Sequence, residues 1–236
     1  MPHTPASTRT TVRRGANRAV YDDDRIRSIL SAGLIAHVGV ATADGPIVLP
    51  MAYGVRPVVA STSDGDADGG DGHEVLVHGA VANAMLRAGR TVDVCVTVTI
   101  VDGLVVARTP FHNSMNYRSV VIRGTATAID DPDERLAALR VINDHIAPVW
   151  DTARPPSASD VKKTLVLAVP LTEASAKIRA GDPIDEDGDM DGPHWAGLVP
   201  LGTRWGEPTT AADLRCDAAV PDAVSALAGR DAHAAN

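Results

Sequence analysis

His78 is the side chain whose type and position best suit chemistry in this chain. It ends the strand-like run Val75-Leu76-Val77 and stands directly before Gly79. Its imidazole can bind a metal ion or carry a proton near neutral pH. The simpler interpretation is a strand-end histidine that hydrogen-bonds to backbone, and the residue type alone does not separate the two.

The turn after His78 gathers groups that favour an anion. Gly79 leads into a helix expected over 80–89, and a helix N-terminus presents free N–H groups to negative charge. Asn83, and Arg87 one turn further on, would add side-chain donors. A phosphate group could bind here, although many strand–helix turns of this composition bind nothing.

A second set of candidates opens the long strand expected over 116–129. Arg118 offers paired donors to a phosphate or carboxylate, and Tyr117 offers a ring for stacking. Because strand side chains alternate, only one of the two is expected to line a given site, and either could instead be solvated or pack in an interface. His112, in the preceding loop, is a candidate substrate contact.

Caps, turns and hydrophobic spacing divide the chain into hairpin strands and three helices. Residues 92–100 alternate valine or isoleucine with polar residues, the clearest strand pattern present. Asp44-Gly45 and Asp102-Gly103 are expected to turn the chain between strands. The expected helices are 22–33, 80–89 and 130–146, and the expected strands are 34–40, 47–53, 55–60, 74–78, 92–100, 104–109, 116–129, 164–171 and 195–201.

Strands in hairpins, without strict strand–helix alternation, exclude a doubly wound parallel sheet. The pattern predicts a mainly β (α+β) fold, an antiparallel barrel with peripheral helices. We expect a disordered leader over 1–19, the barrel domain over 20–205, and an extended or disordered tail over 206–236.

Composition narrows the possible partners and the compartment. The net charge of -8 argues against nucleic acid or an anionic membrane surface as partner, and no apolar run reaches the roughly 20 residues of a membrane span. The N-terminus has no apolar signal region, and two unpatterned cysteines predict a reducing, cytoplasmic location. The acidic runs 61–72 and 182–192 lack the glutamate that ends a calcium loop, so no metal site is predicted.

Three segments carry a family resemblance. Residues 115–126 (MNYRSVVIRGTA) resemble the long strand of pyridoxamine-phosphate-oxidase-related proteins, especially the nitroimidazole-reductase-like branch. Val75 to Gly79 followed by Asn83 resembles the strand–histidine–loop–helix element of that family, and residues 160–177 resemble its later part. The three matches occur in the family's order and span about 20–201.

The resemblance implies an FMN-binding split β-barrel, a homodimer with cofactor sites at the subunit interface. It implies a flavin-dependent oxidoreductase acting on a small organic substrate, with His78 as the catalytic residue beside the ring. The cofactor-binding residues that it implies are His78, Gly79, Asn83, Arg87, Tyr117, Arg118, Met51 and Tyr53. For Met51 and Tyr53, backbone amides along the flavin ring are the expected contact.

Two alternatives stay open from the sequence. One is a haem-binding oxidase or monooxygenase on the same barrel, with His78 as axial ligand of haem b and FAD as a further cofactor. The other is a non-catalytic cofactor-binding protein, which the low aromatic content of 3% favours because flavin rings often stack on aromatic residues. All three hypotheses expect the His78 turn and the Tyr117–Arg118 strand to meet around one planar molecule.

Overall fold

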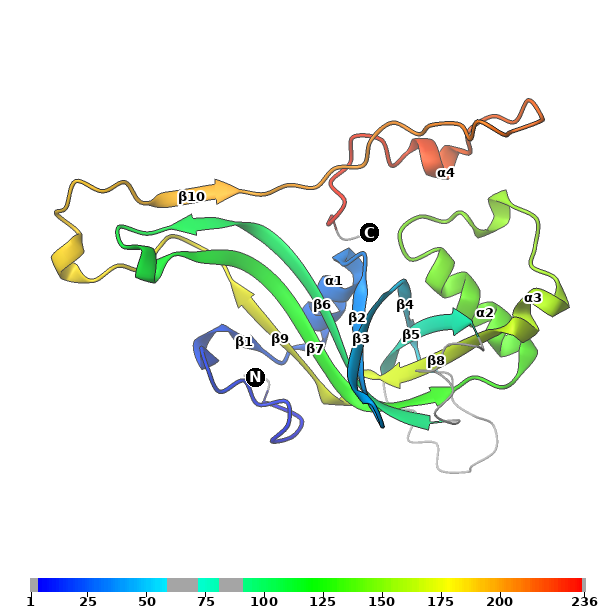
Figure 1. Ribbon diagram of the computed structural model, residues 1–236, viewed down its shortest axis with the longest axis horizontal. Helices are drawn as coiled ribbons and strands as arrows, with labels where there is room; N and C mark the ends of the chain where they lie inside the picture. Colours follow the sequence, from blue (N-terminus) through cyan, green and yellow to red (C-terminus); the bar gives the residue numbers. More distant parts are fainter. Residues whose placement is uncertain (1–3, 59–71, 81–90, 235–236) are drawn as a thin grey trace.

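The protein is described by a computed structural model over residues 4–58, 72–80 and 91–234 (Figure 1). The helix expected over 80–89, with Asn83 and Arg87, lies outside the described residues, as does nearly all of the acidic run 61–72.

One antiparallel sheet forms the body of the molecule, with the strand order β3-β2-β6-β7-β8-β5-β4. Only Ala52 separates Met51, the end of β3, from Tyr53, the start of β4, so the two edges of the sheet meet at this corner. The edges are not paired to each other, and the sheet therefore curls into an open, split barrel, which confirms the predicted fold class. These strands are β2 (Ala36–Thr42), β3 (Gly45–Met51), β4 (Tyr53–Pro57), β5 (His73–Ala80), β6 (Thr91–Val106), β7 (Ser114–Ala128) and β8 (Thr164–Pro170).

Three shorter strands extend this sheet. β1 (Ala19–Val20) pairs with β9 (Ala174–Arg179), which itself pairs with β7. β10 (Gly197–Pro200) pairs with the far half of β6. Together β10, the end of β6 and the start of β7 form a projection that we call the arm: Val101–Val106, 114–117 and Gly197–Pro200 (Figure 1).

Local capping explains where the helices begin. In α1 (Asp23–Ala32), the side chain of Asp22 accepts a hydrogen bond from the Arg25 N–H, and in α2 (Pro132–Asn143) Asp131 caps a helix that starts with proline. Ser157 and Asp160 form a capping box at α3 (Ala158–Lys163). A short helix, α4 (Asp222–Ser225), lies near the C-terminus, and no helix in the described part of the chain is long and apolar enough to span a bilayer.

The core follows the alternation expected of β6. Val94, Val96, Val98 and Ile100 are buried inside the barrel, where Tyr53 is among the largest fully buried side chains. A second cluster lies outside the barrel wall, where Leu76 of β5 and Val166 of β8 meet Ile142 of α2. This second cluster fixes α2 against the strand that ends near His78.

The expected turn at Asp102-Gly103 is wrong. β6 continues through these residues to Val106, with a bulge between Val101 and Gly103, and β7 pairs with it on both sides of the bulge. The Asp102 carboxylate accepts a hydrogen bond from Arg118 of β7 at 2.8 Å, which holds the bulge against its neighbour. A Cβ at Gly103 would lie 2.9 Å from the carbonyl oxygen of Val199, so the close approach of β10 requires glycine here.

Both terminal segments contact the barrel in the structure. In the N-terminal segment, Thr10 is buried and Lys177 of β9 donates a hydrogen bond to the Arg14 carbonyl at 2.8 Å. In the C-terminal segment, the Ala232 N–H donates to the Thr203 carbonyl at 2.8 Å, and a ring nitrogen of His233 lies 2.9 Å from the carbonyl oxygen of Ala32. Between these contacts, residues 206–220 are exposed and form no helix or strand.

Candidate functional site

A cavity of about 330 Å³ opens beside His78, between the end of β5 and helices α2 and α3. His78 pairs with Val166 of β8, so the strand pair fixes its backbone at the cavity wall. Most of the lining is apolar and comes from α2 and the segment after it. The lining residues are Ala52, His78, Leu139, Ile142, Asn143, Ile146, Trp150, Pro156, Asp160, Val161 and Thr164.

The His78 imidazole is in its neutral form, which is the form that can bind a metal ion or accept a proton. Burial lowers its pKa below the usual histidine value, because the charged form loses solvation. The ring is therefore neutral at pH 7, and it makes no hydrogen bond to any other residue that the structure describes. A neutral imidazole on an apolar wall can donate a lone pair to a metal ion or accept a proton.

The strand corner at Met51 to Tyr53 borders the same cavity at Ala52. Met51 and Tyr53, on either side of Ala52, are buried in the barrel core. The Tyr53 hydroxyl donates a hydrogen bond to the Leu30 carbonyl, and its ring packs on that of His145 at 4.3 Å. Tyr53 is thus a core side chain, and Ala52 is the residue of this corner that lines the cavity.

Tyr117 and Arg118 lie at the other end of β7. Arg118 is bonded to Asp102, and Tyr117 lies between Val101 of β6 and Arg179 of β9. These neighbours place both residues on the arm, where the Arg118 guanidinium already has a carboxylate partner.

The distance between the two sets of candidates follows from the strand register. β8 joins them, since His78 pairs with Val166 and the nearby Leu167 pairs with Ala128 at the end of β7. Tyr117 lies eleven residues before Ala128, which is about 35 Å of strand. One chain therefore does not bring His78 and Tyr117 together, and a site that uses both needs two copies of the chain.

His112, the predicted substrate contact, also lies near the arm. It ends the short helix η3 (Pro110–His112), and its Nε2 atom is 3.9 Å from the Glu186 carboxylate. It is therefore remote from His78 within the chain.

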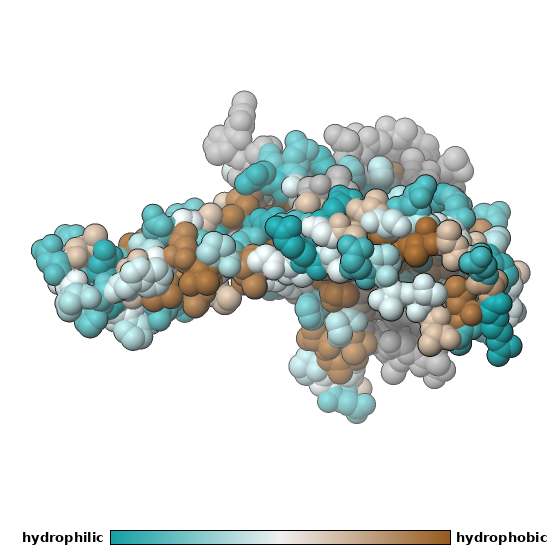
Figure 2. Space-filling model, turned by 90° about the horizontal axis from the view of Figure 1, so that it is seen from above, coloured by the Kyte–Doolittle hydropathy of each residue, from teal (hydrophilic) through white to brown (hydrophobic). Residues whose placement is uncertain are grey.

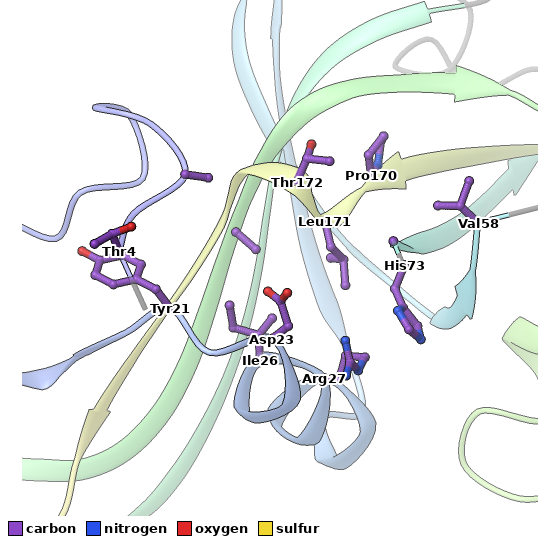
Figure 3. Close-up of a pocket in the computed structure, with 13 residues that line it drawn as sticks. Thr4, Tyr21, Asp23, Ile26, Arg27, Val58, His73, Pro170, Leu171 and Thr172 are labelled. Atoms are coloured by element: carbon purple, nitrogen blue, oxygen red, sulfur yellow. The ribbon is translucent and has the colours of Figure 1, made fainter. Parts of the chain in front are cut away.

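A larger cavity, of about 610 Å³, lies on another side of the barrel (Figure 3). Figure 3 shows Asp23 and Arg27 of α1 on the side of Leu171 and His73 of β5, whereas the Tyr21 ring lies beside Thr4. Its polar groups already have partners in several cases: Arg27 pairs with Asp24, and the Tyr21 hydroxyl accepts a hydrogen bond from the Val12 N–H. We place the candidate site at the smaller cavity because its walls are mainly apolar. The larger cavity also holds a histidine nitrogen, Nδ1 of His73, that is buried without a hydrogen-bond partner among the described residues.

Sequence reasoning missed the residues that complete this cavity. Trp150 and Pro156 come from the connector after α2, which has no hydrophobic periodicity to mark it, and Asp160 comes from the short helix α3. The one available signal was Trp150 itself, one of three tryptophans in a chain with few aromatic residues. Among the described residues, no cluster of three metal-ligating side chains was found.

An open antiparallel barrel with outer helices defines a split-barrel protein, and in this one a mainly apolar cavity lies beside His78. Residues 22–178 match the model of the pyridoxamine 5'-phosphate oxidase family. The chain belongs to this family, as its sequence resemblance predicted.

Solved structures of similar proteins cover nearly the whole chain. The flavocytochrome Anf3 from Azotobacter vinelandii is 31% identical, with a TM-score of 0.82 over 94% of this chain and 98% of that chain. The FAD and haem binding protein from Mycobacterium smegmatis is 28% identical, with a TM-score of 0.78 over 92% of this chain and 99% of that chain. A putative 5-nitroimidazole antibiotic resistance protein from Bacteroides thetaiotaomicron is 23% identical, with a TM-score of 0.49 over 68% and 86%. No curated protein matches the sequence.

Proposed function

We propose that this chain is a haem- and flavin-binding oxidoreductase in which His78 is an axial ligand of the haem iron. The observation that carries the proposal is an imidazole on the wall of an apolar cavity, neutral and without a hydrogen bond to the residues that the structure describes. Support comes from two similar structures that cover 94% and 92% of this chain, one named a flavocytochrome and the other an FAD and haem binding protein.

The cavity residues fit a haem group. Leu139, Ile142 and Ile146 offer an apolar wall to a porphyrin plane, and the Trp150 indole adds an aromatic surface. Imidazole nitrogen is a common axial ligand of haem iron, and burial keeps that nitrogen unprotonated. When bound, haem would supply one-electron chemistry, while the protein binds it, orients it and excludes water.

The flavin completes the proposed redox pair. The sequence resemblance implied FMN, whereas the name of the Mycobacterium smegmatis relative favours FAD. Because Tyr117 and Arg118 are about 35 Å of strand from His78, a site that uses both needs a second copy of the chain. The proposal thus includes a homodimer with cofactors near its interface, in the cytoplasm, where the free thiols of Cys95 and Cys216 would stay reduced.

The arm provides a surface for that homodimer. Val199, Leu104 and Met115 pair across its three strands in one row, and their exposed fractions are 50%, 45% and 44%. Hydrophobic side chains along the arm are visible in Figure 2, whereas Val105, on the opposite face of its strand, is fully buried. The arm thus has one buried and one exposed apolar face. An exposed apolar face is typical of a sheet that packs against another layer of protein.

An absorption spectrum of the protein, purified from cells supplied with a haem precursor, tests the cofactor assignment. We expect a Soret band and a flavin spectrum, with both groups identified by mass spectrometry after release. His78→Ala should lose the haem, while His37→Ala, a change at an exposed position on β2, should keep it. An intact Soret band with full haem occupancy in His78→Ala would overturn the ligand assignment.

Turnover tests the enzymatic part of the proposal. We expect the loaded protein to oxidise a reduced nicotinamide or a reduced flavin, with oxygen or a nitroaromatic compound as acceptor. Bound cofactors without any turnover would instead support the non-catalytic, cofactor-binding alternative.

Light scattering after size-exclusion chromatography tests the dimer. We expect a dimer for the natural chain and a monomer for Leu104→Glu, which puts a charge in the centre of the arm row. Val48→Glu, at a position on β3 that is 62% exposed, is the matched control and should remain dimeric. A natural chain that is monomeric at micromolar concentration would refute this part of the proposal.

A further inference from the structure

A second cavity, of about 290 Å³, adjoins the His78 cavity. The two share Asn143, Trp150, Pro156 and Asp160 in their linings, so they lie side by side, and we call the pair the hollow. The second cavity adds Val149, Ala153 and Arg154. The hollow therefore runs from an imidazole at one end, along apolar walls, to a guanidinium at the other.

Arg154 keeps most of its hydrogen-bonding capacity in this position. Among the described residues it donates one hydrogen bond, to the Pro155 carbonyl at 2.7 Å, and its side chain is 76% exposed. Its nearest carboxylate oxygen, on Asp160, is 3.8 Å away, too far for a hydrogen bond. A guanidinium has five N–H donors, so several are left for a ligand.

The nearby carboxylates already have other partners. Asp160 accepts hydrogen bonds from the Ser157 N–H at 2.9 Å and the Ser157 hydroxyl at 2.8 Å, and these bonds lower its pKa. Asp151 and Asp144 both pair with Arg140 on α2. Arg154 forms an ion pair with Asp160 at 3.8 Å, but that pair uses none of its hydrogen-bond donors, so the guanidinium can still donate to an anionic ligand.

We propose that Arg154 binds the carboxylate side chains at one edge of the haem whose iron His78 ligates. This inference rests on the proposed function and adds the residue that fixes the orientation of the ring. Haem has an apolar plane and an edge that carries two carboxylates. The apolar walls of the hollow would suit the plane, and the Arg154 guanidinium would suit the carboxylates. Arginine suits this edge because its planar donors can bind a carboxylate through two parallel hydrogen bonds.

Titrations of the full-length protein with two forms of haem test the inference. Binding is measured from the change in the Soret band. The protein is purified from haem-depleted cells and titrated with haem and with haem dimethyl ester, in which both carboxylates are blocked. Arg154→Gln should weaken binding of haem about tenfold or more, the loss expected for a charge-assisted hydrogen bond. It should leave binding of the ester unchanged, and Arg154→Lys, which keeps the charge, should restore part of the affinity for haem.

The control and the contrary outcomes separate this inference from the proposed function. Arg25→Gln, at an exposed position on α1, should bind both haems like the natural chain. Equal haem affinity of Arg154→Gln and the natural chain would overturn the inference but leave His78 as ligand. Equal weakening for haem and ester would mean a structural effect and would also overturn it. A natural chain that binds neither haem would overturn the proposed function, and this inference with it.

Discussion

Gly54 on β4 is the point where the backbone of α2 packs closest to the barrel, and its replacement should loosen the helix that walls the cavity. A Cβ at Gly54 would lie 2.7 Å from the Val141 carbonyl oxygen and 2.9 Å from its carbonyl carbon. Carbon–oxygen contacts are normally about 3.3 Å or longer, so α2 would have to move by about 0.6 Å. Since the obstacle is backbone rather than a flexible side chain, we expect Gly54→Ala to lower the free energy of unfolding by about 2 kcal/mol.

Gly124→Ala on β7 is the matched control for this change. Its added Cβ would meet Val169 Cγ1 at 3.6 Å, an ordinary contact. Both variants replace a strand glycine by alanine, so the effect on the unfolded chain is the same and cancels. Urea unfolding at one fixed protomer concentration measures the difference, and haem titration should show weaker binding by Gly54→Ala. Unfolding free energies of the two variants that agree within about 0.5 kcal/mol would refute the packing argument.

Two further predictions concern charge. The ion pair of Arg56 and Glu74, 2.7 Å apart, is nearly buried, with side chains 10% and 11% exposed. Glu74→Gln should therefore lower the free energy of unfolding, measured in urea, by about 2 kcal/mol. The loss is moderate because Arg56 still pairs with Glu134 at 2.8 Å. Burial lowers the pKa of His78, and also that of His145, where a bond to the Gly33 carbonyl partly offsets it. As the pH drops, both histidines therefore bind a proton in the unfolded chain near about pH 6.5, before they do so in the folded protein. The free energy of unfolding should fall as the pH drops from about 6.5 through the lowered pKa values. Urea midpoints that stay constant between pH 7.5 and 5 would contradict this reasoning.

The parts of the fold that the sequence predicted correctly are governed by neighbouring residues. Asp22 begins α1 as expected, because N-capping depends on a few adjacent positions. Gly33 also ends the helix as expected, but the close contacts that require glycine there are with Val98 and Tyr53, which are distant in sequence. The alternation in β6 placed Val96 and Val98 in the core, because strand side chains alternate wherever one face is covered. Such rules act before any tertiary contact is known.

The structure at Asp102-Gly103 could not be predicted from adjacent residues. The same two residues suit a hairpin turn and a bulge, and the choice depends on whether a neighbouring strand continues past them. Here β7 is long enough to pair on both sides, and Arg118 binds the Asp102 carboxylate. That partner is distant in sequence, so the dipeptide alone could not reveal it.

The residues of the candidate site also differ in whether adjacent residues predict their position. His78 was predictable because it ends a clear strand within a recognisable element. Trp150 and Arg154 were not, because they lie in a connector without periodicity, and only the packing of α2 on Leu76 brings that connector beside the histidine. A residue contributed by an irregular segment is visible only once the elements around it are placed.

The length of β7 limits what one chain can do. It pairs continuously with β6 from Ser114 to Thr127, so the arm and the His78 cavity are held at opposite ends of one stiff ribbon. Within a chain, no motion that preserves this ladder can bring Tyr117 to His78. If both act on the same redox centre, that centre lies between two copies of the chain, and the apolar row on the arm is the surface available to hold them together. If they do not, the His78 hollow must serve as a site by itself, and its lining offers an imidazole on one side and the Arg154 guanidinium on the other.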